Sequence, residues 1–341
     1  MRWVILACAF LFVWLLEAQQ AVLCTIEGRT VDAGTDKALR GVRLTLRVGD
    51  ERLSSPGIEV LSDPQGLFRF ANLRPGSYIL LGTRKDYATF AYRSRIALAP
   101  GERVTGLVLH LVRSGRITGR VVDDRGRRVE FATVAAVPVG SSQPPPVDGR
   151  AVVGGGADAK GNFVFEDLQP GKYVVWASPA SMQPASHIQE GEAASFPMAS
   201  GRALRSSYYP SAPEANSATR LEVLPGKKLS NIRVTLRKGT VYVIAGRVVN
   251  RPTAVSYKSL LISLRSPNAP LPRLGASVQP DGGFIVRDVE PGTYDLYLEE
   301  IVTQSYVGPF GGTNAVEGTR RRGRVAVAVT GQDVAGVVLS Y

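Results

Sequence analysis

Histidine is the natural starting point for chemistry, because the chain has only two, His110 and His187. His187 and Glu190 form a His-x-x-Glu pair, which is the spacing of a zinc-binding pair. A catalytic zinc needs three protein ligands and a general base beside its open position. The other histidine belongs to a different part of the chain, and no third ligand accompanies His187. The sequence therefore predicts no metal site and no cofactor.

A nucleophilic or acid–base site is not indicated either. His110 lies between Leu109 and Leu111, where strand alternation directs it to the outer face, and no paired acid or nucleophile aligns with it. The chain contains no Gly-x-Ser-x-Gly elbow, no Gly-x-x-x-x-Gly-Lys-Ser loop and no Cys-x-x-Cys pair. We therefore predict a protein that is not an enzyme and that acts by binding.

Aromatic side chains are the candidate binding residues, because a flat exposed ring stacks on a sugar face or anchors a protein interface. The candidates are Trp176, Tyr208, Tyr209 and Tyr297. Alternation along their strands places Trp176 and Tyr297 on the outward face that also carries Asp295. Two alternatives stay open. Loops of the same or a neighbouring module cover Trp176, and the two adjacent tyrosines pack a long loop down instead of binding a ligand.

Three ungapped segments of similar sequence explain how these residues are positioned. They are residues 63–78, 158–173 and 279–294. Each has a glycine suited to the positive φ of a hairpin turn, then alternating apolar residues with the period of a half-buried strand. Each ends in a Pro-Gly turn and a strand that begins with tyrosine.

Further strands flank each copy. A Gly-Arg strand precedes it, at residues 27–31, 118–122 and 245–249, and a Gly-led strand follows, at 101–111, 226–236 and 331–341. Regularly spaced strands separated by turns predict β-sandwiches. We expect three tandem modules, at residues 22–113, 114–238 and 239–341. The second copy is longer because of residues 139–156 and 181–219, which we expect to be loops.

The full pattern resembles the carboxypeptidase regulatory-like domain. It consists of Gly-Arg-Val-Val, then Asp-x-x-Gly-x-Phe-x-Phe-x-x-Leu-x-Pro-Gly-x-Tyr, and it recurs three times over nearly all of the chain after residue 21. The resemblance implies an all-β fold of three seven-stranded Greek-key sandwiches of the transthyretin (prealbumin) type, related to adhesin B-type repeats and starch-binding-like folds. The third copy departs most, because its turn aspartate is shifted to Asp281. Such modules accompany many exported proteins, so the resemblance implies a fold more than a function.

Residues 1–21 have the pattern of a signal peptide. Arg2 precedes an apolar run at 4–16, and polar and small residues follow at 17–21. A run of this length is short for a membrane span, which needs about 20 residues. We expect cleavage after Ala18 or Ala21, no integral membrane span afterwards, and a periplasmic or secreted protein. A lipid anchor on Cys24 is not expected, because Leu23 stands where lipoprotein processing needs a small residue.

The formal net charge of +12 comes from scattered arginines and one run, Arg320-Arg321-Arg322 followed by Arg324. Scattered basic residues are typical of a solvated surface, whereas a nucleic-acid-binding protein concentrates its positive charge beside aromatic residues that stack on bases. We therefore predict no nucleic-acid partner.

Together these features predict an exported, non-catalytic, multi-module scaffold or binding protein of the cell envelope, with a protein or polysaccharide partner. Carbohydrate binding through exposed aromatics is the alternative, and an accessory protein of a metallopeptidase is a remote one. The short junctions at residues 113–115 and 238–240 predict limited hinge freedom between modules.

Overall fold

The computed structural model describes residues 23–48, 57–92, 95–140, 153–180, 201–267, 269–271, 273–307 and 313–341. The predicted signal peptide and the His187–Glu190 pair lie outside these residues. Within them, the regular structure is β-strand apart from two 3₁₀ turns, Ala215–Ser217 and Tyr257–Ser259, which confirms the all-β class. No helix in this described part is long and apolar enough to cross a membrane.

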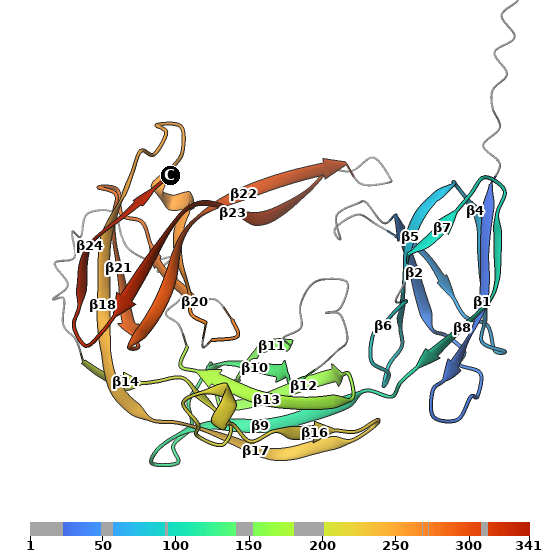
Figure 1. Cartoon of the computed structure of the whole chain (residues 1–341), viewed down its shortest axis with the longest axis horizontal. Coiled ribbons are helices and arrows are strands. Elements are labelled where there is room, and N and C mark those ends of the chain that lie inside the picture. The colour runs from blue at the N-terminus through green and yellow to red at the C-terminus, as the bar shows by residue number, and fades with distance from the viewer. Residues whose placement is uncertain are drawn as a thin grey trace, which may run out of the picture. The chain divides into compact units, whose positions relative to one another are not determined.

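The chain divides into two compact units (Figure 1). One extends to Arg84 and includes Phe90–Leu111, and the other comprises Lys85–Thr89 and Val112–Tyr341. The first unit contains one sandwich and the second contains two. The boundaries expected for three modules stay a prediction.

The first sandwich pairs a three-stranded sheet with a five-stranded sheet. The former has the order β4 (Leu67–Leu73), β1 (Cys24–Asp32), β8 (Arg103–Leu111). The latter has the order β3 (Ile58–Leu61), β2 (Arg43–Val48), β5 (Gly76–Thr83), β6 (Phe90–Ala91), with β7 (Ile96–Leu98) also on β5. Strand β1 is antiparallel to β4 and parallel to β8. The two-residue β6 raises the strand number of this sandwich above the expected seven.

The second sandwich repeats this plan. Its three-stranded sheet has the order β12 (Asn162–Leu168), β9 (Gly115–Asp123), β17 (Lys228–Leu236). The facing sheet has the order β11 (Val153–Gly156), β10 (Thr133–Pro138), β13 (Gly171–Ser178), β15 (Ser207–Tyr208), with β16 (Leu221–Val223) on β13. The first and last strands, β9 and β17, are again parallel.

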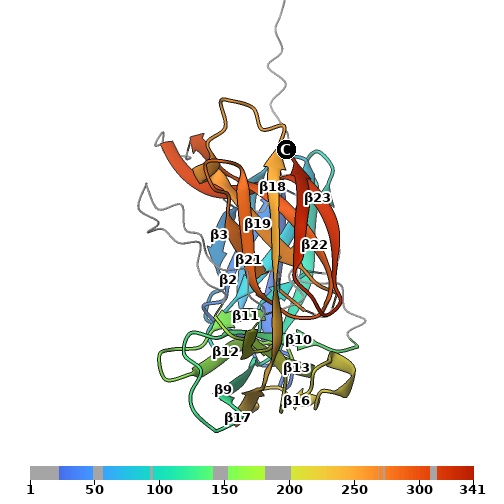
Figure 2. The same ribbon diagram turned by 90° about the vertical axis from the view of Figure 1, so that its left-hand side faces the viewer.

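The third sandwich has the same two layers. In one sheet, β18 (Lys238–Val249) lies between β21 (Gly283–Val289) and β24 (Val334–Ser340). The other sheet has the order β20 (Arg273–Ser277), β19 (Leu260–Arg265), β22 (Gly292–Val307), β23 (Thr313–Val329). Figure 2 shows β18 as one continuous strand, and its first residues pair with β14 (Gly201–Leu204).

The prediction that residues 139–156 and 181–219 are loops was wrong in part. Val153–Gly156 forms β11 on the edge of β10, although three of its four residues are glycine. Gly201–Leu204 and Ser207–Tyr208 form β14 and β15. These segments are strands because the open edges of neighbouring strands supply backbone partners, which does not require an alternating apolar pattern.

The repeated residues hold equivalent places in all three sandwiches. The first phenylalanine of each copy lies against the glycine of the opening strand: Phe68 on Gly28, Phe163 on Gly119 and Phe284 on Gly246. The tyrosine after each Pro-Gly turn donates a hydrogen bond to the carbonyl four residues earlier: Tyr78 to Arg74 (2.8 Å), Tyr173 to Gln169 (2.7 Å) and Tyr294 to Glu290 (2.8 Å). The repeated sequence therefore specifies the interior and the turns.

The turn before each first phenylalanine explains the aspartate of the pattern. Asp158 Oδ1 accepts hydrogen bonds from the backbone N–H groups of Lys160 and Asn162, both at 2.8 Å. The bond to Asn162 is the main reason that the pKa of Asp158 lies below its usual value. In the third copy the shifted Asp281 accepts from Gly283 instead, at 2.8 Å.

Candidate binding surfaces

His110, the histidine within the described residues, lies on the surface beside one exposed carboxylate. His110 Nδ1 lies 3.5 Å from Asp36 Oδ1, and the two side chains are 55% and 80% exposed. The described ranges contain no group of three or more histidine, cysteine, aspartate or glutamate side chains arranged to hold a metal ion.

Trp176 points out of its sandwich, as its strand alternation predicts, but the ring is covered. On β13, Val175 and Ala177 enter the interior cluster, whereas Trp176 joins a separate cluster on the opposite face with Tyr208. Leu271, from the β19–β20 loop of the third sandwich, also packs there. Trp176 is only 6% exposed. A ring covered from both its own and the next sandwich is not available to stack on a sugar.

Tyr208 and Tyr209 fix the long insertion onto the sheet. Tyr208 lies opposite Trp176 across β13 and β15 and is 4% exposed, and burial raises its pKa above the usual value. The Tyr209 ring packs against the interior cluster, and its backbone N–H donates to the Val175 carbonyl at 2.7 Å. Both residues serve packing in this structure.

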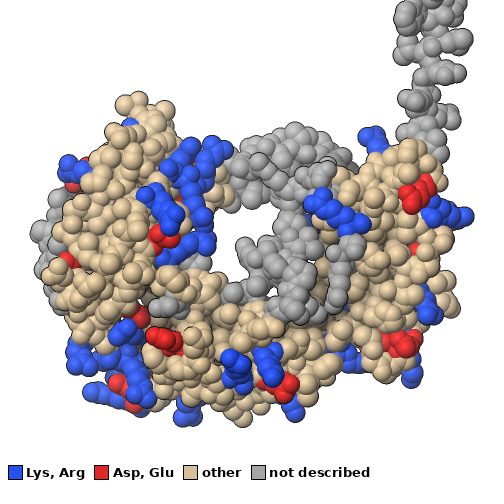
Figure 3. Space-filling view, in the orientation of Figure 1, with Lys and Arg blue, Asp and Glu red and all other residues tan. Residues whose placement is uncertain are grey.

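Tyr297 lies half-buried on the outer face of the β20-β19-β22-β23 sheet. The guanidinium carbon of Arg321 is 4.5 Å from its ring centroid, and that of Arg324 is 6.0 Å away. Arg324 also donates to both carboxylate oxygens of Asp295, at 2.9 and 3.0 Å, and this contact raises the pKa of Arg324. Figure 3 shows basic side chains gathered over β22 and β23.

A β-bulge brings the two arginines to Tyr297. Leu298 pairs with Gly323 and Glu299 pairs with Arg321, so Arg322 is the extra residue. Without it, Arg321 and Arg324 would lie on opposite faces of the strand, because strand residues alternate. A β-carbon on Gly323 would lie 2.1 Å from the Ser340 carbonyl oxygen, so the close approach of β23 to β24 requires glycine.

The extra residue, Arg322, forms an ion pair on the other side of the bulge. Its Nε donates to Glu300 Oε2 at 2.8 Å, and the Tyr341 hydroxyl donates to the same oxygen at 3.1 Å. The arginine hydrogen bond, against the opposing effect of burial, holds the pKa of Glu300 below its usual value. Each of the three arginines therefore has a carboxylate nearby: Arg321 has Glu299, Arg322 has Glu300 and Arg324 has Asp295. These carboxylates weaken the positive electrostatic potential around β23.

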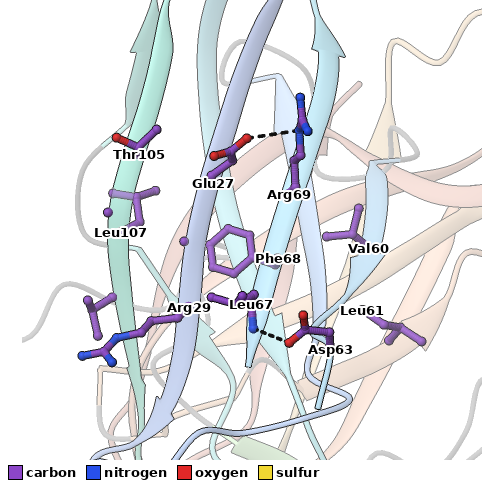
Figure 4. A pocket seen from close by; sticks show the side chains of 13 residues that line it. Glu27, Arg29, Val60, Leu61, Asp63, Leu67, Phe68, Arg69, Thr105 and Leu107 are labelled. Carbon is purple, nitrogen blue, oxygen red and sulfur yellow. Dashed lines mark hydrogen bonds and ion pairs between the residues drawn. The ribbon is translucent and has the colours of Figure 1, made fainter. Parts of the chain in front are cut away.

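A groove of about 610 Å³ lies on the first sandwich, across the outer face of β4-β1-β8 and the adjacent β3 (Figure 4). Among its lining residues, Glu27 places its Oε1 atom 3.1 Å from both Arg69 Nε and Arg103 Nη2, so one carboxylate bridges two arginines. Leu61 and Leu67 are exposed beside it. Sequence reasoning missed this bridge, because its members come from three strands that are far apart in the chain.

Comparison with known proteins identifies no family for this chain. No family model matches the chain, and no curated protein matches it. Several solved structures are similar to the chain at low identity.

One is the Bacillus anthracis TIE protein, with 14% identity and a TM-score of 0.25, over 94% of this chain and 51% of that one. The chain thus spans about half the length of that protein. Another is BcpA, the major pilin subunit of Bacillus cereus, with 12% identity and a TM-score of 0.23, over 93% and 99% of the two chains. A putative carbohydrate binding protein from Bacteroides uniformis has 8% identity and a TM-score of 0.22, over 45% and 87%. Likeness at this level carries no argument about function.

Proposed function

We propose that this protein is an exported, non-catalytic scaffold or binding protein of the cell envelope, whose sandwiches are rigid spacers that present partner surfaces. The pattern of residues 1–21 and the resemblance of the repeats to carboxypeptidase regulatory-like domains support this proposal. Cys24 is 1% exposed, and its thiol donates to the Ala99 carbonyl at 3.0 Å. That burial favours a thiol used for packing over one used for lipid attachment.

The junction between the second and third sandwiches is the observation that carries the proposal. Strand β17 ends at Leu236 and β18 begins at Lys238, so a single residue separates them. Glu290 of the third sandwich accepts a hydrogen bond from the Ser206 backbone N–H at 2.6 Å and a longer one from Arg205 Nε at 3.4 Å. Together with the β14–β18 pairing and the contact of Leu271 with the Trp176 cluster, these bonds fasten the two sandwiches at several points. Modules fastened in this way act as a spacer of fixed geometry.

Residual dipolar couplings test this rigidity. In the wild-type protein, couplings from the second and third sandwiches should fit one alignment tensor. The double variant Glu290→Ala/Leu271→Ala should need two, because it removes the carboxylate and the apolar contact. Glu222→Ala/Leu224→Ala, at exposed positions of the second sandwich, is the matched control and should keep a single tensor. Two independent tensors in the wild type would contradict the spacer function.

Carbohydrate binding is the second candidate, and Tyr297 is the observation that favours it. Of the four predicted aromatics, it is the one that lies on an outer sheet face without being packed into a cluster, although Arg321 and Arg324 lie over its ring. Affinity electrophoresis with neutral polysaccharides should show retardation that Tyr297→Ala abolishes. Equal mobility with and without every neutral glycan would eliminate this candidate.

A further inference from the structure

The outer face of the β12-β9-β17 sheet carries four basic residues, Arg116, Arg120, Lys228 and Arg233, which we name the basic face. Ile117 and Val121 of β9 enter the interior, so the arginines that alternate with them point outward. Ile232 and Val234 of β17 also enter the interior, which turns Arg233 outward, and Lys228 is exposed. Figure 3 shows basic side chains along the lower margin of the molecule, over β9 and β17.

Like charges face each other on this surface. In the parallel ladder, Lys228 is opposite Arg116 and Arg233 is opposite Arg120. Like charges directly opposite each other on neighbouring strands repel and destabilise the pairing. The arrangement therefore lowers the stability of the isolated sandwich.

Few internal partners offset this repulsion. Arg116 Nη2 lies 3.2 Å from Glu166 Oε1, but Arg116 Nε is buried with no hydrogen-bond partner among the described residues. Arg120 Nε donates to the neutral Asn162 side chain at 2.9 Å. Within the same described part of the chain, neither Lys228 nor Arg233 takes part in an ion pair.

The first sandwich shows what is missing. There Glu27 bridges Arg69 and Arg103. The repeat places Thr118 at the position of Glu27 and Lys228 at the position of Arg103, because Thr25 pairs with Arg103 as Arg116 pairs with Lys228. The second sandwich thus has a cation at the position of Arg103 but no carboxylate at the position of Glu27 to neutralise it.

We propose that the basic face binds a linear acidic polysaccharide through its carboxylate, sulfate or phosphate groups. The four cations span about 13 Å along the strands and about 5 Å across them, a strip that fits one polymer chain and is narrow for a membrane leaflet. The described outward residues of β9, β12 and β17 include no aromatic, so recognition rests on charge and not on ring stacking. The choice of a polysaccharide over a nucleic acid rests on the proposed export.

Chromatography on immobilised heparin and polygalacturonate tests the proposal on the full chain after leader removal. The wild type should be retained on both, and elute as salt screens the charges. Lys228→Glu/Arg233→Glu should weaken binding about tenfold or more. Arg125→Glu/Lys160→Glu changes net charge equally at exposed turns of the same sandwich and should bind as the wild type does. Circular dichroism should be alike for all three proteins, and Lys228→Glu/Arg233→Glu should melt no lower than the wild type, because it replaces two like-charge pairs by opposite-charge pairs.

A second variant needs no loss of a basic residue. Thr118→Glu gives the second sandwich a carboxylate at the position that Glu27 holds in the first. It should weaken retention, because the new carboxylate pairs with Lys228. Ala159→Glu, which adds the same charge on an exposed turn, should leave retention unchanged. No retention of the wild type on either polysaccharide would overturn the proposal. So would equal weakening by both charge-reversal pairs, or binding to phosphatidylglycerol vesicles without binding to either polysaccharide. Retention on neutral dextran that survives high salt would also overturn it.

Discussion

The ring of Phe163 lies so close to Gly119 that a β-carbon on the glycine would be 2.5 Å from the Cζ atom of the ring. The same β-carbon would be 2.0 Å from the Ile232 carbonyl oxygen on the last strand. One glycine therefore lets a large ring cross beneath the opening strand while the closing strand pairs with it. The same contact occurs in the other two sandwiches, which explains why the first strand of every copy has glycine at this position.

Gly119→Ala should destabilise the second sandwich by about 2 kcal/mol or more, because overfilling a packed interior forces both neighbours to move. Gly156→Ala is the control, since it also lies in a strand but a β-carbon there meets nothing within 4 Å. Urea unfolding followed by Trp176 fluorescence measures both. Equal stability of the two variants would show that the ring and backbone adjust without cost.

Tyr173→Phe should lower stability by about 1 kcal/mol, the net value of a typical buried hydrogen bond, because it leaves the Gln169 carbonyl without its donor. Tyr78→Phe and Tyr294→Phe should have similar effects on their own sandwiches, and the three should add because they are far apart. Tyr209→Phe is the control. Calorimetry measures the melting of each variant. An unchanged melting profile for Tyr173→Phe would contradict the role assigned to the Tyr173 hydroxyl.

Leu271→Asp should expose Trp176, because it places a charge against a cluster that keeps this ring 6% exposed. In protein lacking residues 1–21, Trp176 is the single tryptophan, so its emission reports this site alone. We expect a red shift and faster quenching by acrylamide. Val338→Asp, at an exposed position of the same sandwich, should leave the emission unchanged.

Glu300→Gln should change how the stability of the third sandwich depends on pH. The Glu300 pKa is lowered from its ordinary value of 4.5 in the folded protein, chiefly by Arg322. A carboxyl with a lowered folded pKa contributes stability above its unfolded pKa and loses it as the pH falls through the folded one. The wild type should therefore exceed the variant at pH 7 and lose that advantage progressively below about pH 4.5. Arg322→Gln should reproduce the change, and the double variant should add little to either single one.

The repeated pattern was enough to predict the all-β class and the outward direction of Trp176, because strand alternation is a local property. Covering of Trp176 by a loop was one of the alternatives that the sequence left open, but Leu271 could not be named as the covering residue, since it comes from a loop about a hundred residues later. The paired arginines on Tyr297 depend on the bulge at Arg322, which is set by the register of two strands and not by the arginine run itself.

Some turn chemistry was also visible only in the structure. Asn72, Asp167 and Asp288 hold the same place in the three copies, and all have φ between 53° and 57°. Asparagine and aspartate tolerate this left-handed conformation better than most residues. Each lies beside a register shift in the strand, so the residue type follows from pairing with the opening strand, which a linear pattern does not show.

The parallel pairing of the first and last strand in every sandwich has a mechanical consequence. Because β1 and β8, β9 and β17, and β18 and β24 run in the same direction, the chain enters each module at one end and leaves it at the other. A pull on the two ends of the chain would load these ladders along the strands, so that their hydrogen bonds share the force instead of opening one at a time. We expect single-molecule stretching to show high, separate rupture peaks.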